Sequence, residues 1–132
     1  ISGPEEEWAE VLLSVIPNAA SYLKQIQEMN FECAMVIRNG ARAELALNRL
    51  ERIKELCRCE AGYLETGDGT AGLAVSCRLT AALYLSECLM KAILLRKESR
   101  GSHYRWDYPE KKENLSKRIL SVWDDGVKTG WE

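Results

Sequence analysis

The stretch LAVSCRLTAALYLSECLMKAILLRKESR, residues 73–100, decides the fold of this chain of 132 residues. From Leu73 to Leu95, apolar residues lie on nearly every face of the helix that the pattern predicts. The few polar positions in that stretch are Ser76, Arg78, Thr80, Ser86, Glu87 and Lys91. A helix that is apolar all round has to be covered on all sides, so we expect it at the centre of a bundle or beneath a further partner.

A first helical pattern precedes it, starting at Pro4 and reaching Val36. Proline suits the first turn of a helix, and the three glutamates that follow favour the positive end of the helix dipole. Pro17 is expected to break or kink this helix, after which apolar residues continue at helical spacing. Asn39 and Gly40 form the predicted helix stop.

A second helix is predicted from about Ala41 to Cys59, because Leu47, Leu50 and Ile53 share one face with Cys57. The glycine-rich segment TGDGTAG, residues 66–72, then leads into the third helix, with Asp68 or Thr70 as its expected cap. Short connections between three such helices predict an all-α fold. We expect one domain over 1–132, with a three-helix antiparallel bundle of the spectrin-repeat type over about 4–101.

After Gly101 the periodicity changes. The segment SHYRWDYPE, residues 102–110, alternates as an extended segment does. The segment KRILSVWDDG, residues 117–126, predicts a short strand that ends in an Asp-Gly turn. The sequence therefore predicts a short extended C-terminal tail over about 102–132.

Composition narrows the class of function. The formal net charge of −2 gives no electrostatic reason to expect a nucleic-acid partner. Neither a basic leader nor a run of about 18 apolar residues stands out, so we expect a cytoplasmic domain without membrane insertion. Five cysteines form an odd set, and Cys33, Cys77 and Cys88 lie in apolar helical patterns, which favours reduced core thiols.

Three weak patterns of catalytic or binding residues are better explained by structure alone. Cys57 and Cys59 lack the two-residue gap of zinc and redox motifs. The glycines of residues 66–72 lack the lysine of a phosphate-binding loop. Ser99, His103 and Asp107 lie too close together in sequence to hold the geometry of a catalytic triad. We expect no catalytic, cofactor-binding or metal-binding residue in the chain.

The basic residues at the end of the third helix need compensation. Arg96 and Arg100 are four residues apart and are expected to share the last helical turn, where like charges repel. A solvated cationic helix end is one explanation. The other is pairing, in which Arg96, Arg100 or Arg105 binds Glu98 or Asp107, or a carboxylate of another domain.

The stretch RKESRGSHYRWDYPE, residues 96–110, resembles a motif in the C-terminal helical domain of the succinate dehydrogenase and fumarate reductase flavoprotein family. That family also includes L-aspartate oxidase and the adenylylsulfate reductase flavoprotein. The matching positions are Arg96, Glu98, Ser99, Arg100, Gly101, His103, Arg105, Asp107 and Pro109. The segment MNFECAMVIRNGARAELALNRLERIKEL, residues 29–56, is also similar, so the resemblance spans about 25–110. Beyond Pro109 the sequence departs from the family pattern.

The resemblance implies a role within a larger enzyme. Family members bind FAD in an N-terminal domain, and no G-x-G-x-x-G motif follows a strand in this chain. The chain then corresponds to a structural and docking domain of an FAD-dependent oxidoreductase acting on succinate, fumarate or a related substrate, and is inactive by itself. Its implied partners are a flavin-binding domain, in the same or a partner chain, and an iron–sulfur subunit, with the parent at the cytoplasmic face of the membrane. The nine matching residues would hold the domain junction, with His103 in a structural role.

An independent helical interaction module with no redox role is the alternative. The gene upstream of Ile1 separates the two hypotheses. A flavin domain in the same frame favours the first, and a start codon close to Ile1 favours the second.

Overall fold

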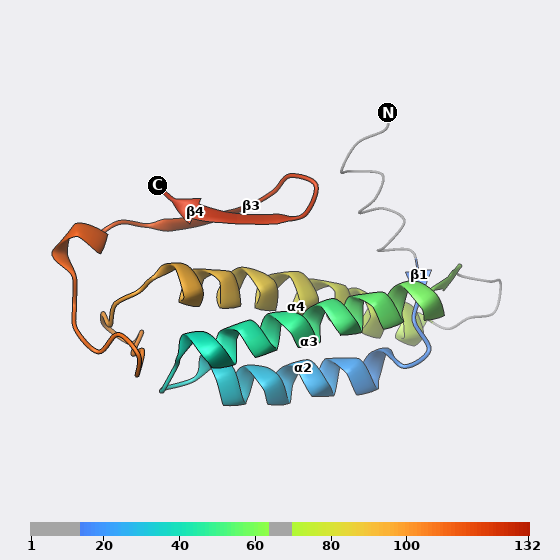
Figure 1. Ribbon diagram of the computed structural model, residues 1–132. Helices are drawn as coiled ribbons and strands as arrows, with labels where there is room; N and C mark the ends of the chain where they lie inside the picture. The colour runs from blue at the N-terminus through green and yellow to red at the C-terminus, as the bar shows by residue number, and fades with distance from the viewer. Residues whose placement is uncertain (1–13, 64–69) are drawn as a thin grey trace.

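The computed structural model describes residues 14–63 and 70–132 (Figure 1). Three long helices make up most of the described chain, and two small antiparallel sheets accompany them. The helices are α2 (Ala19–Ala34), α3 (Gly40–Glu60) and α4 (Thr70–Leu95). The strands are β1 (Ser14–Val15), paired with β2 (Gly62–Tyr63), and β3 (Ile119–Trp123), paired with β4 (Val127–Trp131). A 3₁₀ turn, η1, spans Glu113–Leu115.

Helix α2 begins two residues after Pro17, where the sequence predicts a break. Its buried face carries Tyr22, Ile26, Met29 and Cys33, which recur every three or four residues and confirm the predicted apolar stripe. Residues 4–13 of the predicted first helix lie outside the described residues. Its continuation before Pro17 was wrong, because Ser14 and Val15 form strand β1, which is held in place by pairing with β2, a contact distant in sequence.

The predicted helix stop at Asn39 and Gly40 was wrong, because these residues begin a helix. Helix α2 already ends at Ala34. The side-chain oxygen of Asn39 accepts a hydrogen bond from the backbone N–H of Arg42 at 2.8 Å, so Asn39 is the N-cap of α3. Asparagine is favoured both at this cap and after a helix C-terminus, which explains the error. Helix α3 extends to Glu60, close to the predicted end.

The three helices lie side by side, and α3 runs in the opposite direction to α2 and α4 (Figure 1). Helix α4 contacts both other helices, as its apolar sequence predicts. Fully buried apolar side chains from all three helices meet between them, and they include Ile26, Leu50, Leu79, Met90 and Ile93. The prediction of three packed helices is confirmed, and the likeness to a spectrin repeat stays a prediction.

The C-terminal tail folds back into a hairpin and is not simply extended. The predicted strand is confirmed as β3, and β4 was not predicted. Their register places Ile119 opposite Trp131 and Trp123 opposite Val127. Between the strands, Asp125 has a φ of 52° and Gly126 a φ of 117°, the left-handed backbone that a tight hairpin turn requires.

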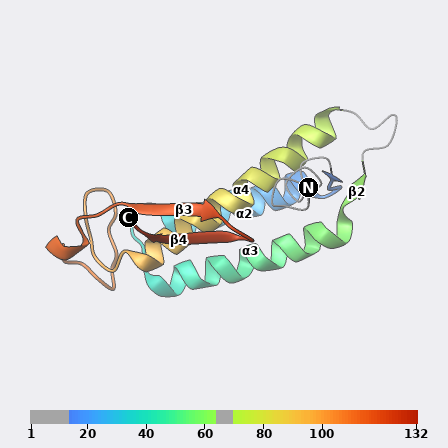
Figure 2. The same cartoon turned by 90° about the horizontal axis from the view of Figure 1, so that it is seen from above.

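The hairpin packs along the outer side of α4 (Figure 2). The rings of Tyr84 and Trp123 meet edge to face with centroids 4.7 Å apart. The ammonium of Lys91 donates a hydrogen bond of 2.6 Å to the backbone oxygen of Val127. Part of the apolar surface of α4 is therefore covered by the chain itself.

One described helix, α4 over Gly72–Leu95, is long and apolar enough to cross a membrane by length and composition alone. A core helix of a globular bundle meets the same criterion, and α4 packs against two helices and a hairpin. Of the cysteines predicted in the core, Cys33 is buried, whereas Cys77 and Cys88 are only partly buried. These two were misplaced because nearly every face of α4 is apolar, so its sequence does not show which face is buried.

Candidate functional site

The motif of residues 96–110 is a loop and does not continue the helix. Helix α4 ends at Leu95, so the prediction that Arg96 and Arg100 share its last turn was wrong. Arg100 and His103 exchange two backbone hydrogen bonds of 2.7 and 2.9 Å, which close a tight turn. Gly101 lies in this turn with a φ of 58°, a conformation that glycine adopts without steric cost.

Glu98 is the buried centre of the loop, with 0% of its surface exposed. Its carboxylate accepts hydrogen bonds from Arg96 Nη1 at 2.7 Å, Arg100 Nε at 2.9 Å and the backbone N–H of Lys112 at 2.7 Å. The hydrogen bond from Arg100 is the main cause that lowers the pKa of Glu98 to about 2. The prediction that Arg96, Arg100 or Arg105 pairs with Glu98 or Asp107 inside the domain is confirmed, and Arg96 and Arg100 share Glu98.

The same two arginines attach the tail to the end of α4. The guanidinium of Arg96 donates to the backbone oxygens of Leu115 at 2.9 Å and Lys117 at 2.6 Å. Arg100 Nη2 donates to the backbone oxygen of Lys112 at 2.9 Å. One buried carboxylate thus orients two guanidinium groups, and their remaining donors fix the start of the tail.

Arg105 and Asp107 form a second ion pair, which connects two helix ends. Arg105 is 2% exposed, and its Nη1 donates to the backbone oxygens of Ile93 at 2.8 Å and Leu94 at 3.1 Å, at the C-terminus of α4. Its Nε and Nη2 bind the two oxygens of Asp107 at 2.9 and 2.6 Å. Asp107 Oδ2 also accepts from the backbone N–H of Gly40 at 3.0 Å, at the N-terminus of α3.

Each charge of this pair suits the helix end that it touches. A cation is favourable at the C-terminus of α4, and an anion is favourable at the N-terminus of α3. The hydrogen bond from Arg105 is the main cause that lowers the pKa of Asp107. The present geometry of this contact depends on glycine at position 40, because a Cβ atom there would lie 2.8 Å from Arg105 Nη2 and one of the two would have to shift. Sequence reasoning missed Gly40 as part of the site.

His103 is held in one neutral tautomer. Arg38 Nη1 lies 2.9 Å from His103 Nδ1, and His103 Nε2 lies 3.1 Å from the backbone oxygen of Arg96. A guanidinium can only donate, so Nδ1 accepts and Nε2 carries the proton. Burial and the positive charges of Arg38, Arg105 and Arg96 lower the pKa of His103. These contacts fit a structural histidine that joins the α2–α3 connection to the motif.

Ser99, His103 and Asp107 do not form a triad. The hydroxyl of Ser99 accepts from the backbone N–H of Arg105 at 2.9 Å and donates to the backbone oxygen of Tyr108 at 2.8 Å. His103 binds Arg38 and the backbone oxygen of Arg96, and Asp107 binds Arg105 and the backbone of Gly40. Of the nine motif residues, seven use their side chains in one connected polar network. Gly101 shapes the turn, and Pro109 lies exposed beside the network.

A second buried carboxylate, Glu87, lies in the middle of α4 and was missed as a site. It is 6% exposed and binds the ammonium groups of Lys54, from α3, and of Lys91, one helical turn further along, the latter at 2.8 Å. Lys54 also binds Glu51 at 3.0 Å. The signal in the sequence was a glutamate in a mostly apolar helix with a lysine, Lys91, four residues further on.

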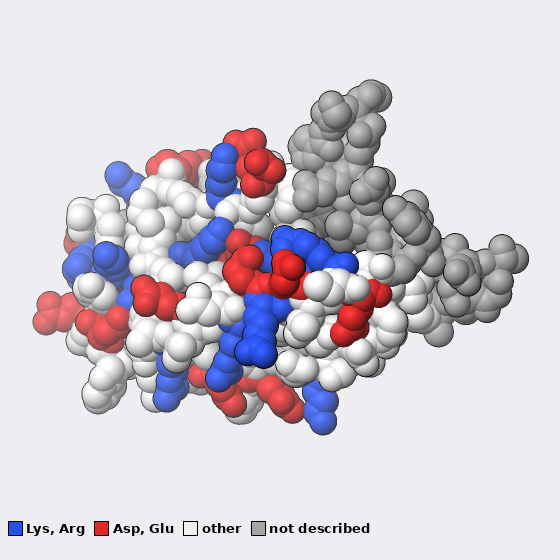
Figure 3. All heavy atoms as spheres, turned by 45° about the vertical axis from the view of Figure 1, so that its right-hand side comes forward, with Lys and Arg blue, Asp and Glu red and all other residues white. Residues whose placement is uncertain are grey.

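The remaining candidate residues do not come together as a site. Cys57 is buried, which raises the pKa of its thiol to about 11, whereas Cys59 is exposed. No group of three potential metal-binding side chains occurs among residues 14–63 and 70–132. Most of the glycine-rich segment 66–72 lies outside the described residues. Acidic and basic side chains intermix on the face shown in Figure 3, and no surface of a single charge dominates it.

Fold and network together define the class of protein: a small helical domain whose polar network is built from the end of its longest helix. Residues 23–130 match the family model described as the C-terminal region of the fumarate reductase flavoprotein. The chain belongs to this family, which confirms the resemblance seen in its sequence. The match continues past Pro109, so the expected departure of the tail from the family pattern was wrong.

Relatives of known name agree with this assignment. The chain is 31% identical over 101 residues to the fumarate reductase flavoprotein subunit of Helicobacter pylori, covering 76% of this chain and 14% of the relative. It is 33% identical over 86 residues to L-aspartate oxidase of Acinetobacter baylyi, covering 65% of this chain and 15% of the relative. Among solved structures, Mycobacterium smegmatis Sdh1 in complex with UQ1 superposes with a TM-score of 0.73 at 27% identity, over 97% of this chain and 23% of that chain. The chain thus spans less than a quarter of each of these proteins.

Proposed function

We propose that this chain is the structural and docking domain of an FAD-dependent oxidoreductase of the succinate dehydrogenase and fumarate reductase type, and that it is not catalytic by itself. The observation that carries the proposal is the polar network of the family motif. Its charged side chains are paired inside the domain, and they tie the end of α4 to α3, to the α2–α3 connection and to the tail. Such a network gives a rigid body suited to docking.

The role of the nine motif residues at the domain junction is part of this proposal. Glu98 and Arg105 are buried, so they act from within by fixing the shape of the loop. The outer side of the same loop is then free to meet a flavin-binding domain, in the same chain or in a partner chain. An iron–sulfur subunit is a further proposed partner, and we place the protein in the cytoplasm, with the parent at the cytoplasmic face of the membrane. We also propose that the three helices are arranged as in a spectrin repeat.

FAD belongs to the parent protein in this proposal, because the described residues do not fit it. A flavin dinucleotide needs free backbone amides at a helix N-terminus to hold its diphosphate. At the N-terminus of α3 two of these amides are already used, since the N–H of Arg42 donates to the side chain of Asn39 and the N–H of Gly40 donates to Asp107. A hollow of about 410 Å³ between α4 and β3 is lined by the guanidinium groups of Arg38, Arg96 and Arg118. These groups already bind His103, Glu98 and Glu132, respectively.

The test uses the purified chain of 132 residues. After incubation with FAD and desalting, we expect no flavin absorbance, and no reduction of fumarate or oxidation of succinate or aspartate. A stoichiometric yellow protein would overturn the proposal. Sequencing the gene upstream of Ile1 tests the other half, since the proposal requires a flavin-binding polypeptide encoded with this chain. A start codon close to Ile1 with no such polypeptide would favour an independent interaction module.

A further inference from the structure

We infer that the domain docks on the flavin-binding part of its parent through an exposed apolar patch at the α2–α3 end of the bundle. This inference rests on the proposed function and adds the face that makes the contact. The patch combines the end of α2 and the connection after it with two aromatic residues of the motif loop. Its members, called the end patch here, are Phe31, Met35, Val36, Ile37, Tyr104 and Trp106.

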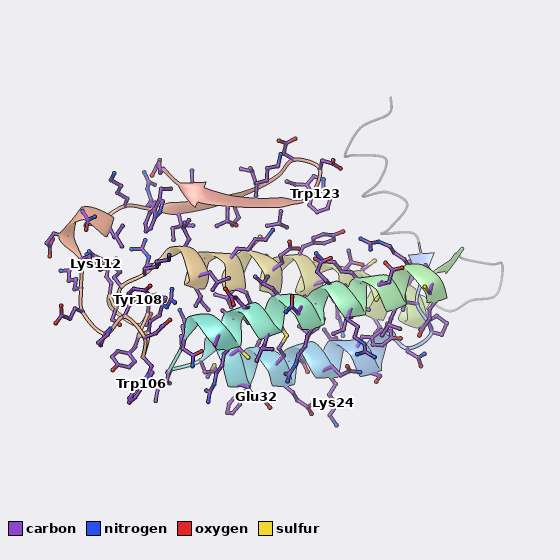
Figure 4. All side chains as sticks on the ribbon, viewed as in Figure 1. Lys24, Glu32, Trp106, Tyr108, Lys112 and Trp123 are labelled. Carbon is purple, nitrogen blue, oxygen red and sulfur yellow. The ribbon has the colours of Figure 1, made fainter. Side chains whose placement is uncertain are left out.

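Backbone hydrogen bonds hold the two halves of the end patch side by side. The N–H of Arg38 donates to the oxygen of Tyr104 at 2.9 Å, and the N–H of Trp106 donates to the oxygen of Arg38 at 2.7 Å. Arg38 and Arg105 thereby form a parallel β-bridge. Figure 4 shows Trp106 at the same end of the molecule as the α2–α3 connection.

The end patch is exposed although its backbone is fixed. Exposure reaches 73% for Val36 and 70% for both Phe31 and Trp106. Ile37 is 54% and Met35 52% exposed. Single exposed apolar side chains are ordinary, but six large ones on adjoining segments form the kind of patch that marks an interaction site. Tryptophan, methionine, tyrosine and phenylalanine are also the residues that protein interfaces favour.

The motif network explains why this surface is rigid. Alternation along the loop turns Arg105 inward, where it is 2% exposed, and leaves its neighbours Tyr104 and Trp106 outside. Arg38 is fixed in the same way, since its guanidinium donates to His103 and to the backbone oxygen of Ala34 at 2.9 Å. A preorganised apolar surface loses little conformational freedom when it is covered.

The length of the related proteins indicates which surface covers the end patch. This chain covers 14% of the Helicobacter pylori relative and 23% of the superposed Sdh1 chain, and both carry several times more protein than the domain itself. A patch that lacks a free charge of its own suits an apolar surface of that remaining protein. We therefore assign the end patch to an apolar surface of the flavin-binding part, in the same chain or in a partner chain.

The test compares the chain alone with the parent flavoprotein in which, or with which, it is encoded. Hydroxyl-radical footprinting, read by mass spectrometry, reports the accessibility of each side chain. In the parent, oxidation of Met35, Phe31 and Trp106 is expected to fall several-fold. Leu85, which is 69% exposed on α4, serves as the reference position for the same measurement.

Substitutions then separate the end patch from other exposed apolar positions. The double variant Val36→Glu with Trp106→Glu in the parent is expected to restore oxidation of Phe31 and Met35 to the level of the isolated chain. The matched control is Leu120→Glu with Val122→Glu, since these hairpin residues are 50% and 58% exposed and lie outside the end patch. All four positions are exposed, so the domain is expected to stay folded, which circular dichroism verifies.

Each outcome decides one question. Protection of the end patch in the parent, lost only in the first double variant, supports the inference. A parent whose end patch stays as reactive as in the isolated chain, or whose protection is lost only in the hairpin control, overturns the inference and leaves the proposed function intact. Protection that already rises with concentration in the isolated chain assigns the patch to a second copy. If no flavin-binding polypeptide is encoded with the chain, the proposed function itself fails.

Discussion

The middle of the bundle and the loop after α4 each bury one carboxylate, and they neutralise it differently. Glu87 is bound by two lysines, Lys54 from the neighbouring helix and Lys91 from its own. Glu98 is bound by two arginines that lie two residues away on either side, and by the backbone N–H of Lys112. The first arrangement joins two helices at one point, and the second organises a whole loop.

The difference lies in what each cation does with its remaining donors. The guanidinium groups at Glu98 also bind backbone oxygens of the tail, so the ion pairs and the course of the chain depend on one another. At Glu87, Lys54 has a second carboxylate in Glu51, and Lys91 is partly exposed, so each cation keeps a partner or water if Glu87 is removed. We therefore expect the loop network to be the more sensitive of the two regions.

Glu98→Gln tests the larger expected effect. The amide keeps the shape of the side chain but removes the negative charge, so Arg96 and Arg100 lose the fully buried carboxylate that compensates and orients them. Breaking a buried pair in this way costs about 3 kcal/mol of unfolding free energy. Urea denaturation of the purified chain, followed by circular dichroism, measures the change.

Hydrogen exchange gives a second measurement on the same variant. The amide of Lys112 is expected to exchange faster, because its acceptor is weakened and the tail is released from the end of α4. A loss of stability below about 1 kcal/mol, the value typical of exposed ion pairs, would contradict the view that Glu98 organises the loop.

Glu87→Gln is expected to cost less, about 2 kcal/mol, because the lysines retain other partners. The same urea titration measures it, and the free energies of the two variants are compared directly. If Glu87→Gln is the more destabilising substitution, the contrast between the two regions is wrong, and the contact between α3 and α4 is the more important one.

What the sequence could predict follows the same division between local and distant contacts. Pairing of Arg96, Arg100 or Arg105 with Glu98 or Asp107 was predicted because these residues are close in sequence and their charges are opposite. The contact of Lys54 with Glu87 was not, since it depends on how two helices pack side by side. The sequence of α4 shows an apolar surface on nearly every face but not which neighbours cover it.

The tail shows a similar limit. Its Asp-Gly turn predicted the end of β3, because the turn type is encoded by two adjacent residues. Strand β4 has weaker signals, with Lys128 and Gly130 in the sequence VKTGW, and it is stabilised by contacts with α4 such as the bond from Lys91 to Val127. Similarly, Asn39 was assigned to the wrong helix end because both ends favour asparagine, and only the bond to Arg42 distinguishes them.

Gly40→Ala tests the smallest effect, and its sign is informative. Replacing glycine by alanine in a helix normally stabilises a protein by about 0.4 to 1 kcal/mol. At Gly40 the new Cβ would lie 2.8 Å from Arg105 Nη2 and 3.1 Å from Asp107 Oδ2, so the ion pair that joins α3 to α4 would have to shift. We expect a net loss of about 1 kcal/mol, because overpacking costs more than the helix gains. Gly72→Ala is the matched control, since among the described residues its Cβ would meet Val15 Cγ1 alone, at 3.8 Å, which is an ordinary contact, and this variant should be stabilised. Thermal and urea denaturation show whether each substitution raises or lowers the free energy of unfolding. Stabilisation of Gly40→Ala to the same extent as Gly72→Ala would show that the loop yields easily, and that the network around Arg105 is less rigid than its buried contacts indicate.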